Sequence, residues 1–320
     1  ITPDGSKFVT SDAAGEIKLS SAHSGALLST FSQDRIEPLN SLIILPDGKR
    51  VLTSTDSPGI KIWDIETGKQ VDELTGKKAD ATCLALLPKE SKVVVGARDG
   101  NLYIWDLEKK IVESSLYRTR FSRSLVRDIA VSKYGQTLVV ASTRNEVEIW
   151  SIPLKHMRTS IHTEHIKLED VVVQEVDSLE IISNGPDDEP TVWNSISGAR
   201  ITSMQKTPRG TKSMILSEDG SKLITCGENS PIVIFDLQNF IPLHKLGNPK
   251  TLSCSSLTLS GDDTTLTAAT SIGTVSLQLS WSPLQVNKKC DRNQHAVWNP
   301  LNQSCVKACP AGLYKDEIAG

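Results

Sequence analysis

Apolar and polar residues alternate along most of the chain in short runs that are typical of β-strands. Runs such as RVLTST, KVVVGA and TLVVAS are rich in β-branched residues, and each precedes a shorter alternating run such as IKIWD, LYIWD or VEIWS. No stretch of useful length has the period of an amphipathic helix. We therefore predict a protein that is nearly all β.

The alternating runs belong to a unit that repeats every 42 to 45 residues. A turn signal, seen best as TPDG, LPDG and SEDG, recurs at Gly5, Gly48, Glu90, Gly135, Asp177, Gly220 and Asp262. An aromatic residue or Leu closes an alternating run 14 to 16 residues after each turn, at Leu19, Trp63, Trp105, Trp150, Trp193, Phe235 and Leu277. Seven units of four short strands are typical of a β-propeller. One such sheet cannot cover both of its own faces, so neighbouring sheets must stack around an axis.

Three segments carry a resemblance to a known family. IWDIETGK (Ile62 to Lys69), IWDLEKK (Ile104 to Lys110) and IFDLQN (Ile234 to Asn239) closely resemble the WD-repeat (WD40) pattern, and the resemblance covers about residues 1–282. No Gly-His dipeptide precedes any unit, and Ser151 and Asn194 replace the Asp of the motif. The buried His–Asp–Ser/Thr–Trp hydrogen-bond set of the family is therefore not assumed here.

The repeats define the expected fold and domains. We predict a seven-bladed WD40-type propeller over residues 1–286, followed by a short irregular tail over 287–320 that contains cysteines. The first blade should lack most of its inner strand, because Ile1 falls at the end of that strand. Whether the ring closes, or further repeats lie upstream, stays open.

The composition is that of a globular protein without strong charge bias. Hydrophobic residues make up 38% of the chain, charged residues 23%, and the net charge is −3. No run of eighteen apolar residues could cross a bilayer, and the charge makes nucleic acid an improbable partner. The chain opens at Ile1 without a basic-then-apolar leader, so we expect it to be part of a larger protein.

The six cysteines form two groups. Cys83, Cys226 and Cys254 stand singly in apolar runs, where we expect small buried free thiols, which favours a reducing compartment. The second group, Cys290, Cys305 and Cys309, lies in the tail. These three are candidates for disulfides, because the tail resembles the start of an extracellular cysteine-rich module of the trypsin-inhibitor-like or furin-like kind. A tail with reduced cysteines or a truncated next domain is the alternative.

Arginines gather in loops expected at one end of the propeller. In WD-repeat propellers, partners dock mostly on the face made by the loops into each inner strand and the loops between second and third strands. The predicted binding residues lie in these loops and are Arg98, Arg118, Arg120, Arg123, Arg127 and Arg144. They could receive an acidic or phosphorylated peptide. The alternative is a solvated loop whose arginines pair with local acids such as Asp99 and Glu146.

Two other charged clusters are weaker candidates. The loop Asp187-Asp188-Glu189 could attract a cation or a basic partner, but it reads more simply as an exposed acidic turn. His156, His162 and His165 with Glu164 match no metal motif, and we expect no metal or cofactor. No nucleophile elbow, P-loop or paired-carboxylate motif indicates an enzyme.

The sequence favours a non-catalytic interaction scaffold, a propeller module of a larger cytoplasmic protein whose oligomeric state is not predicted. One alternative is a sensor or lid for an upstream nucleotide-switch ATPase, because the propeller resembles the C-terminal propellers of NACHT and apoptosome-type proteins. A second alternative is an extracellular or secreted modular protein whose propeller continues into cysteine-rich repeats.

Overall fold

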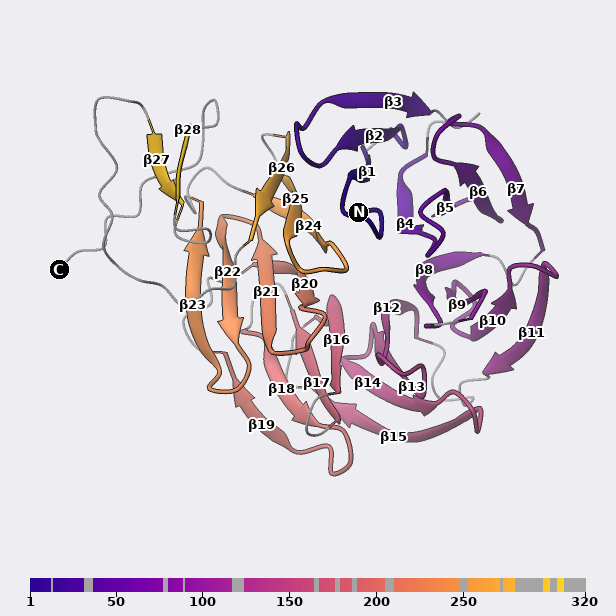
Figure 1. The fold of residues 1–320 in the computed structure, drawn as a ribbon. Coiled ribbons are helices and arrows are strands. Elements are labelled where there is room, and N and C mark those ends of the chain that lie inside the picture. Colours follow the sequence, from indigo (N-terminus) through magenta and orange to yellow (C-terminus); the bar gives the residue numbers. More distant parts are fainter. Residues whose placement is uncertain are drawn as a thin grey trace.

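The chain folds into a ring of seven small antiparallel sheets in a computed structural model (Figure 1). The structure describes residues 1–279 except 13, 32–36, 77–79, 89, 117–123, 164–166, 176–178, 186–188, 205–209, 248–252 and 271–272, with the backbone of 296–299 and 304–307. Every regular element among these residues is a strand. The predicted all-β, seven-bladed propeller is confirmed.

Each blade is a meander in which consecutive strands pair, from an inner strand to an outer one. The inner strands are β4 (Leu39–Ile44), β8 (Ala81–Leu86), β12 (Val126–Val131), β16 (Asp170–Glu175), β20 (Thr211–Leu216) and β24 (Cys254–Leu259). The second strands are β1 (Lys7–Ser11), β5 (Arg50–Thr55), β9 (Lys92–Ala97), β13 (Thr137–Ser142), β17 (Leu179–Asn184), β21 (Lys222–Gly227) and β25 (Thr265–Thr270).

The two remaining sets of strands lie towards the outside of the ring. The third strands are β2 (Ile17–Ser21), β6 (Ile60–Asp64), β10 (Leu102–Asp106), β14 (Glu146–Ser151), β18 (Thr191–Asn194), β22 (Ser230–Asp236) and β26 (Gly273–Gln278). The outer strands are β3 (Leu27–Phe31), β7 (Gln70–Leu74), β11 (Ile111–Leu116), β15 (His156–His162), β19 (Arg200–Ser203) and β23 (Ile241–Leu246). Figure 1 shows these outer strands on the rim.

Blades one and seven each show three strands among the described residues. Blade one is β1-β2-β3 and has no inner strand, as the sequence predicts, and blade seven is β24-β25-β26. In the tail, β27 (Ala296–Asn299) pairs with β28 (Ser304–Lys307) as a separate two-stranded sheet. The predicted domain boundary between residues 286 and 287 lies outside the described residues and stays a prediction.

The turns that join first and second strands follow the predicted signals. The amides of Gly5, Gly48 and Gly220 each donate to the carbonyl three residues earlier, and all three glycines have φ near +70°. In blade seven, Asp263 takes this position with φ of 58°, so the predicted landmark Asp262 is one residue too early. The left-handed conformation is cheapest for Gly and tolerable for Asp, which explains why both occur here.

The third-strand aromatic residues fill the gaps between blades, as predicted. Trp63, Trp105, Trp150 and Trp193 are each at most 5% exposed. In blade one, however, Ser20 and not Leu19 takes the Trp position, because the outer strand has its register shift between these two residues. Phe31 of β3 lies beside Trp63 in the interface of blades one and two, which Trp63 fills.

The tryptophan N–H groups find different acceptors in different blades. Trp63 Nε1 donates to Thr53 Oγ1 (2.9 Å) and Trp193 Nε1 to Ser183 Oγ (2.8 Å), each on the adjacent second strand. Trp150 Nε1 donates to Glu148 Oε2 (3.0 Å) on its own strand, because Val140 stands where the hydroxyl would be. A buried indole N–H needs such a partner. The hydrogen-bond set of the family is therefore replaced in part.

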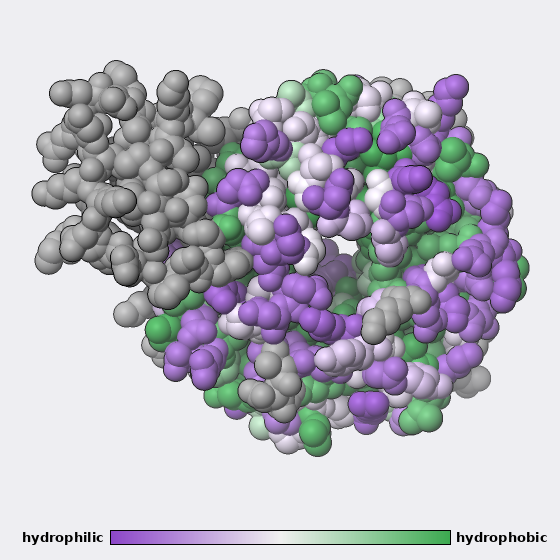
Figure 2. Space-filling view, viewed as in Figure 1, coloured by the Kyte–Doolittle hydropathy of each residue, from purple (hydrophilic) through white to green (hydrophobic). Residues whose placement is uncertain are grey.

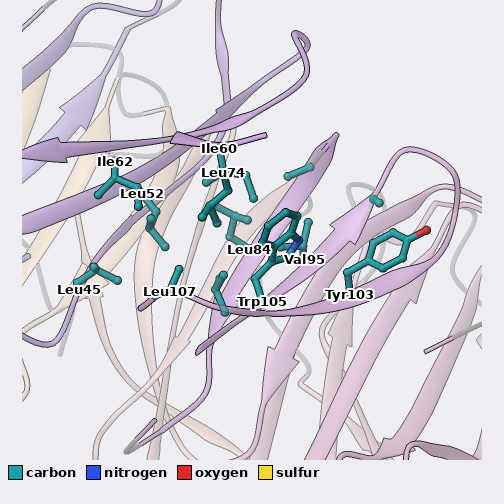
Figure 3. Packing of buried hydrophobic residues seen from close by; sticks show 13 residues of the cluster. Leu45, Leu52, Ile60, Ile62, Leu74, Leu84, Val95, Tyr103, Trp105 and Leu107 are labelled. Carbon is teal, nitrogen blue, oxygen red and sulfur yellow. The ribbon is translucent and has the colours of Figure 1, made fainter. Parts of the chain in front are cut away.

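Six clusters of buried apolar side chains hold the ring together, one between each pair of consecutive blades from one and two to six and seven. Figure 3 shows the cluster of blades two and three, where Trp105 lies beside Leu84 and Val95. No comparable cluster joins blade seven to blade one among the described residues. Burial of this kind is the main stabilising term of a propeller.

A disulfide between Cys226 of β21 and Cys254 of β24 links blades six and seven. Their Cα atoms are 5.6 Å apart although 28 residues separate them in the sequence. The expectation of free thiols is therefore wrong for these two, because the ring places strands of adjacent blades face to face. Cys83 is free and buried, as predicted.

Candidate functional site

The starts of the inner strands and the turns between second and third strands meet on one face of the ring, which we call the loop face. Pairing of Leu39 with Thr55 and of Val126 with Ser142 puts each inner-strand start beside its own turn. Backbone hydrogen bonds close the contact, such as Thr143 N to Leu125 O (3.1 Å). The described parts of the predicted loops thus lie on one face, around the opening that Figure 2 shows through the ring.

A β-bulge near the start of five inner strands turns one side chain of each towards solvent. The bulged residues are Asn40, Thr82, Arg127, Lys212 and Ser255, and all but the half-buried Thr82 are exposed. A bulge re-aims a side chain that would otherwise alternate with the pleat. These residues therefore form a repeated set at the mouth of the channel.

Arg127 belongs to this set and is a residue of strand β12, not of the loop before it. The sequence predicted that Arg127 lies in the loop before this strand. That prediction is wrong, because β12 begins at Val126 and Arg127 is its second residue. Its side chain is exposed at the bulge. Among the described residues, no carboxylate lies within ion-pair distance of its guanidinium. Arg127 is thus available to an acidic group from outside this set.

Arg98 lies in the turn after β9 and is held by an acid of the preceding blade. Its guanidinium pairs with Asp56 Oδ1 (2.5 Å), and Asp56 also accepts from Asn40 Nδ2 (3.1 Å). These contacts, Asn40 first and Arg98 second, hold the pKa of Asp56 below its usual value. The alternative in which Arg98 pairs with an acid of the protein is therefore confirmed, but its partner is Asp56 and not Asp99. Asp99 accepts instead from Tyr103 Oη and from the amide of Asn101.

Arg144 lies in the exposed turn between β13 and β14, in the same blade as Arg127 and at the same end of it. The expected partner Glu146 is 4.0 Å from His162 Nδ1. Arg118, Arg120 and Arg123 lie outside the described residues, as do Asp187 and Asp188. The structure therefore brings Arg127 and Arg144 together on blade four and places Arg98 on the neighbouring blade three.

The loop face as a whole carries both signs of charge. Lys212 pairs with Glu228, which lowers the pKa of that carboxyl, and Lys167 pairs with Glu169 (2.5 Å). Exposed pairs of this kind contribute little to stability. Among the described residues, these pairs offset part of the positive charge of the loop face.

A pair of carboxyl groups behind this face was not anticipated from the sequence. Asp128 Oδ2 accepts from the amide of Val171 (3.0 Å), and Asp170 Oδ2 accepts from that of Met214 (2.5 Å). The two carboxyls are hydrogen-bonded to each other. Burial raises the pKa of both, and the charge of Asp128 raises the pKa of Asp170 further. These hydrogen bonds connect the inner strands of blades four, five and six. Ser213 of blade six makes the equivalent contact with blade seven, because its hydroxyl accepts from Leu257 N (3.3 Å).

The positions of Asp128 and Asp170 carry a signal in hindsight. Aligning the inner strands puts both acids at the place of Ser41, Cys83 and Ser213. A short polar residue there faces the backbone of the next blade. The repeat alignment could therefore have identified an inter-blade contact, although not the raised pKa of the two carboxyls.

The remaining predicted clusters show no chemistry in the described residues. His156 and His162 lie on the exposed outer strand β15, and His165 and Glu164 fall outside the described set. Within that set, no three His, Cys, Asp or Glu side chains converge on one point that could hold a metal ion. No helix there has the length and apolarity to cross a bilayer.

Known proteins show the same repeat. Residues 68–106 match the family described as WD domain, G-beta repeat. Autophagy-related protein 16 of Arabidopsis thaliana is 21% identical over 240 residues, 73% of this chain and 46% of that protein. WD repeat-containing protein 37 of Mus musculus is 27% identical over 192 residues, 57% of this chain and 38% of that protein. Protein LST8 homolog of Drosophila melanogaster is 23% identical over 115 residues, 36% of each.

This chain spans less than half the length of each of these relatives. The likeness is in the repeat, whose matched stretch runs from the outer strand of blade two to the third strand of blade three. Together with the seven-bladed ring, these similarities show a β-propeller whose repeats are similar to the WD40 repeat.

Proposed function

We propose that the chain is a non-catalytic scaffold that docks an acidic or phosphorylated segment of a protein partner on its loop face. The observation that carries the proposal is Arg127, an exposed guanidinium at the channel mouth with no carboxylate within ion-pair distance among the described residues. Arg144 at the same end of blade four adds a second positive charge. A guanidinium binds carboxylate or phosphate through paired, charge-assisted hydrogen bonds.

The other features of the face agree with a peptide ligand. The bulged side chains around the mouth are short and polar apart from Arg127 and Lys212, so an extended segment could cross the opening and meet both cations. WD40 propellers commonly act as protein-interaction scaffolds, and the relatives named above are distant members of that class. Loops held on a rigid scaffold are a usual place for such a site.

A peptide array tests the proposal. The 320-residue protein is incubated with acidic, phosphorylated and neutral peptides, and the strongest ligand is titrated at two salt concentrations. Replacing Arg127 with Glu should weaken binding at least tenfold, since one charge-assisted hydrogen bond contributes about 1.5–3 kcal/mol and the new carboxylate repels the ligand. Binding should also weaken with salt.

Arg158→Glu is the matched control, because Arg158 is an exposed arginine on the outer strand of the same blade and gives the same change in net charge. It should bind like the unchanged protein. Equal affinity of the Arg127→Glu and Arg158→Glu proteins would contradict the proposed face.

The Cys226–Cys254 disulfide bears on the compartment of the protein. The cytoplasmic placement rested partly on free cysteines, and the Cys226–Cys254 disulfide removes that support. Disulfides persist mainly in oxidising compartments, so this bond favours the second candidate, a secreted or extracellular modular protein. Cys290, Cys305 and Cys309 would then form disulfides in the tail. A role beside an upstream nucleotide-switch ATPase stays a prediction from resemblance.

A further inference from the structure

Two blades place an acid beside the bulged side chain of their inner strand. In blade six, the bulged Lys212 pairs with Glu228, the first residue after β21. In blade two, the bulged Asn40 donates through Nδ2 to Asp56 Oδ1 (3.1 Å), the first residue after β5. In these blades, the acid that binds the bulged side chain is therefore supplied by the repeat itself.

In blade four, Thr143 takes the place of that acid. Its amide donates to Leu125 O (3.1 Å), as the amide of Glu228 donates to Gly210 O (2.8 Å), so the two positions are equivalent. The exposed side chain of Thr143 has no charge. The bulged Arg127 thus lacks the acid that blade six supplies to its own bulged residue, and an acidic group of a ligand could take this place.

An exposed leucine lies beside this arginine. Leu125 is 46% exposed and stands two residues ahead of the bulged Arg127. In the other blades with a bulge, the same position is held by Pro38, Asp80, Gly210 and Ser253. None of these four has a long aliphatic side chain. Blade four therefore combines an apolar contact with a cation at the channel mouth.

The turn after β13 holds both features on a fixed backbone. Asn145 N donates to Ser142 O (3.2 Å), and Asn145 O accepts from both the amide (2.8 Å) and the hydroxyl (2.9 Å) of Thr163. The hydrogen bond from Thr143 N ties this turn to Leu125. A ligand that docks here need not order this backbone, which lowers the entropic cost of binding.

The spacing of the two side chains restricts the ligand. Leu125 and Arg127 are two residues apart, so their Cα atoms are at most about 7 Å from each other. In an extended peptide, side chains two positions apart have about this separation and point to the same side. A segment with an acidic side chain and an apolar one at positions i and i+2 could therefore reach both residues.

We propose that the loop face binds a protein segment in which an acidic side chain, a carboxylate or a phosphate, stands two positions from a large apolar one. The acid pairs with Arg127, and the apolar side chain packs on Leu125. This proposal rests on the docking function proposed above and specifies the motif that the site recognises.

The first test uses fluorescent peptides of about twelve residues, capped at both ends. Each has one phosphoserine and one Leu two positions apart, in either order, in a background of Gly, Ala and Ser. In one of the two orders, replacing phosphoserine with Ser should weaken binding to the 320-residue protein at least about tenfold, and replacing Leu with Ser at least about threefold. A glutamate in place of phosphoserine shows which of the two acids the site prefers.

A second test pairs the peptide with the protein. Leu125→Ser should weaken binding of the peptide that has Leu at least about threefold and leave binding of the peptide without Leu unchanged, because the lost contact is between the two leucines. Leu154→Ser is the matched control, since Leu154 is 75% exposed in the turn between β14 and β15, at the opposite end of the blade.

The outcomes separate this motif from the docking function on which it rests. If Arg127→Glu weakens phosphopeptide binding but Leu125→Ser changes nothing, the motif is wrong and the docking function stands. Equal weakening of both peptides by Leu125→Ser also overturns the motif, because the leucine would then act on the fold. If none of the motif peptides binds, the motif is overturned, and if no peptide of the array binds either, so is the docking function.

A third test restores the acid that blade four lacks. In Thr143→Glu, the new carboxylate should pair with Arg127, as Glu228 pairs with Lys212, and weaken phosphopeptide binding at least about tenfold. Thr143→Gln is the matched control, because it has the same length without the charge, and it should bind like the unchanged protein. Equal binding by both variants would show that Arg127 does not receive the acidic group.

Discussion

Leu84 and Leu42 occupy the same position of consecutive repeats, yet their surroundings differ. Leu84 packs in the closed interface of blades two and three, with Trp105 and Val95. Leu42 borders an opening of about 600 Å³ beside β1 of blade one and is half-buried. The residues are identical, so the difference comes from the neighbouring blade. Burial in a propeller is a property of the interface and not of the repeat alone.

The largest expected effect compares these two leucines directly. Leu84→Ala should lower the free energy of unfolding by about 2–5 kcal/mol, because it leaves a cavity in a packed interface. Leu42→Ala should cost about 1 kcal/mol, since its side chain loses less buried area. Urea denaturation monitored by tryptophan fluorescence measures both. Equal losses would show that Leu42 is as well packed as Leu84.

The disulfide strengthens the interface of blades six and seven. Replacing Cys226 and Cys254 together by Ala should lower the free energy of unfolding by about 3 kcal/mol, as expected for a link that closes a loop of this length. Reductant should lower the Tm of the unchanged protein and leave the Tm of the double variant where it is. If reductant lowered the Tm of both proteins by the same amount, the effect would not come from the Cys226–Cys254 bond. Protein purified from its own cells with free thiols at both positions would remove the support for an oxidising compartment.

The smallest predicted effect concerns the carboxyl pair of blades four and five. The raised pKa of Asp170 means that its contribution to stability is complete below the ordinary Asp value of about 4 and is lost as the pH rises through the folded pKa. Asp170→Asn keeps a neutral hydrogen-bonding group, although its amide orientation must suit Asp128. The variant should gain about 1 kcal/mol near pH 8, a Tm rise of about 2–4 °C, and no gain near pH 4.

Thermal unfolding between pH 4 and 8 measures this effect. Asp56→Asn is the control, because the pKa of that exposed carboxyl is lowered and its pH dependence has the opposite sign. An unchanged pH profile in Asp170→Asn would show that the pair is not protonated in the folded protein.

Much of the site could be read from the sequence because it follows the repeat. The 42- to 45-residue spacing placed Arg98 and Arg144 in turns on one face, which is where the structure has them. Arg127 was placed in a loop, since the bulge that exposes a strand residue leaves no trace in the apolar pattern. The partner of Arg98 was missed because Asp56 belongs to another blade, 42 residues away.

The sequence by itself determined the number of blades, the strands of each blade and the aromatic residues between them. These features follow from local alternation, turn residues and a fixed period, all of which are written within one repeat. Only the tertiary structure decided the Cys226–Cys254 bond, the buried position of Asp128 beside Asp170, and the half-buried surroundings of Leu42. Each of these arises between blades, where the ring brings together backbones and side chains that no local pattern relates.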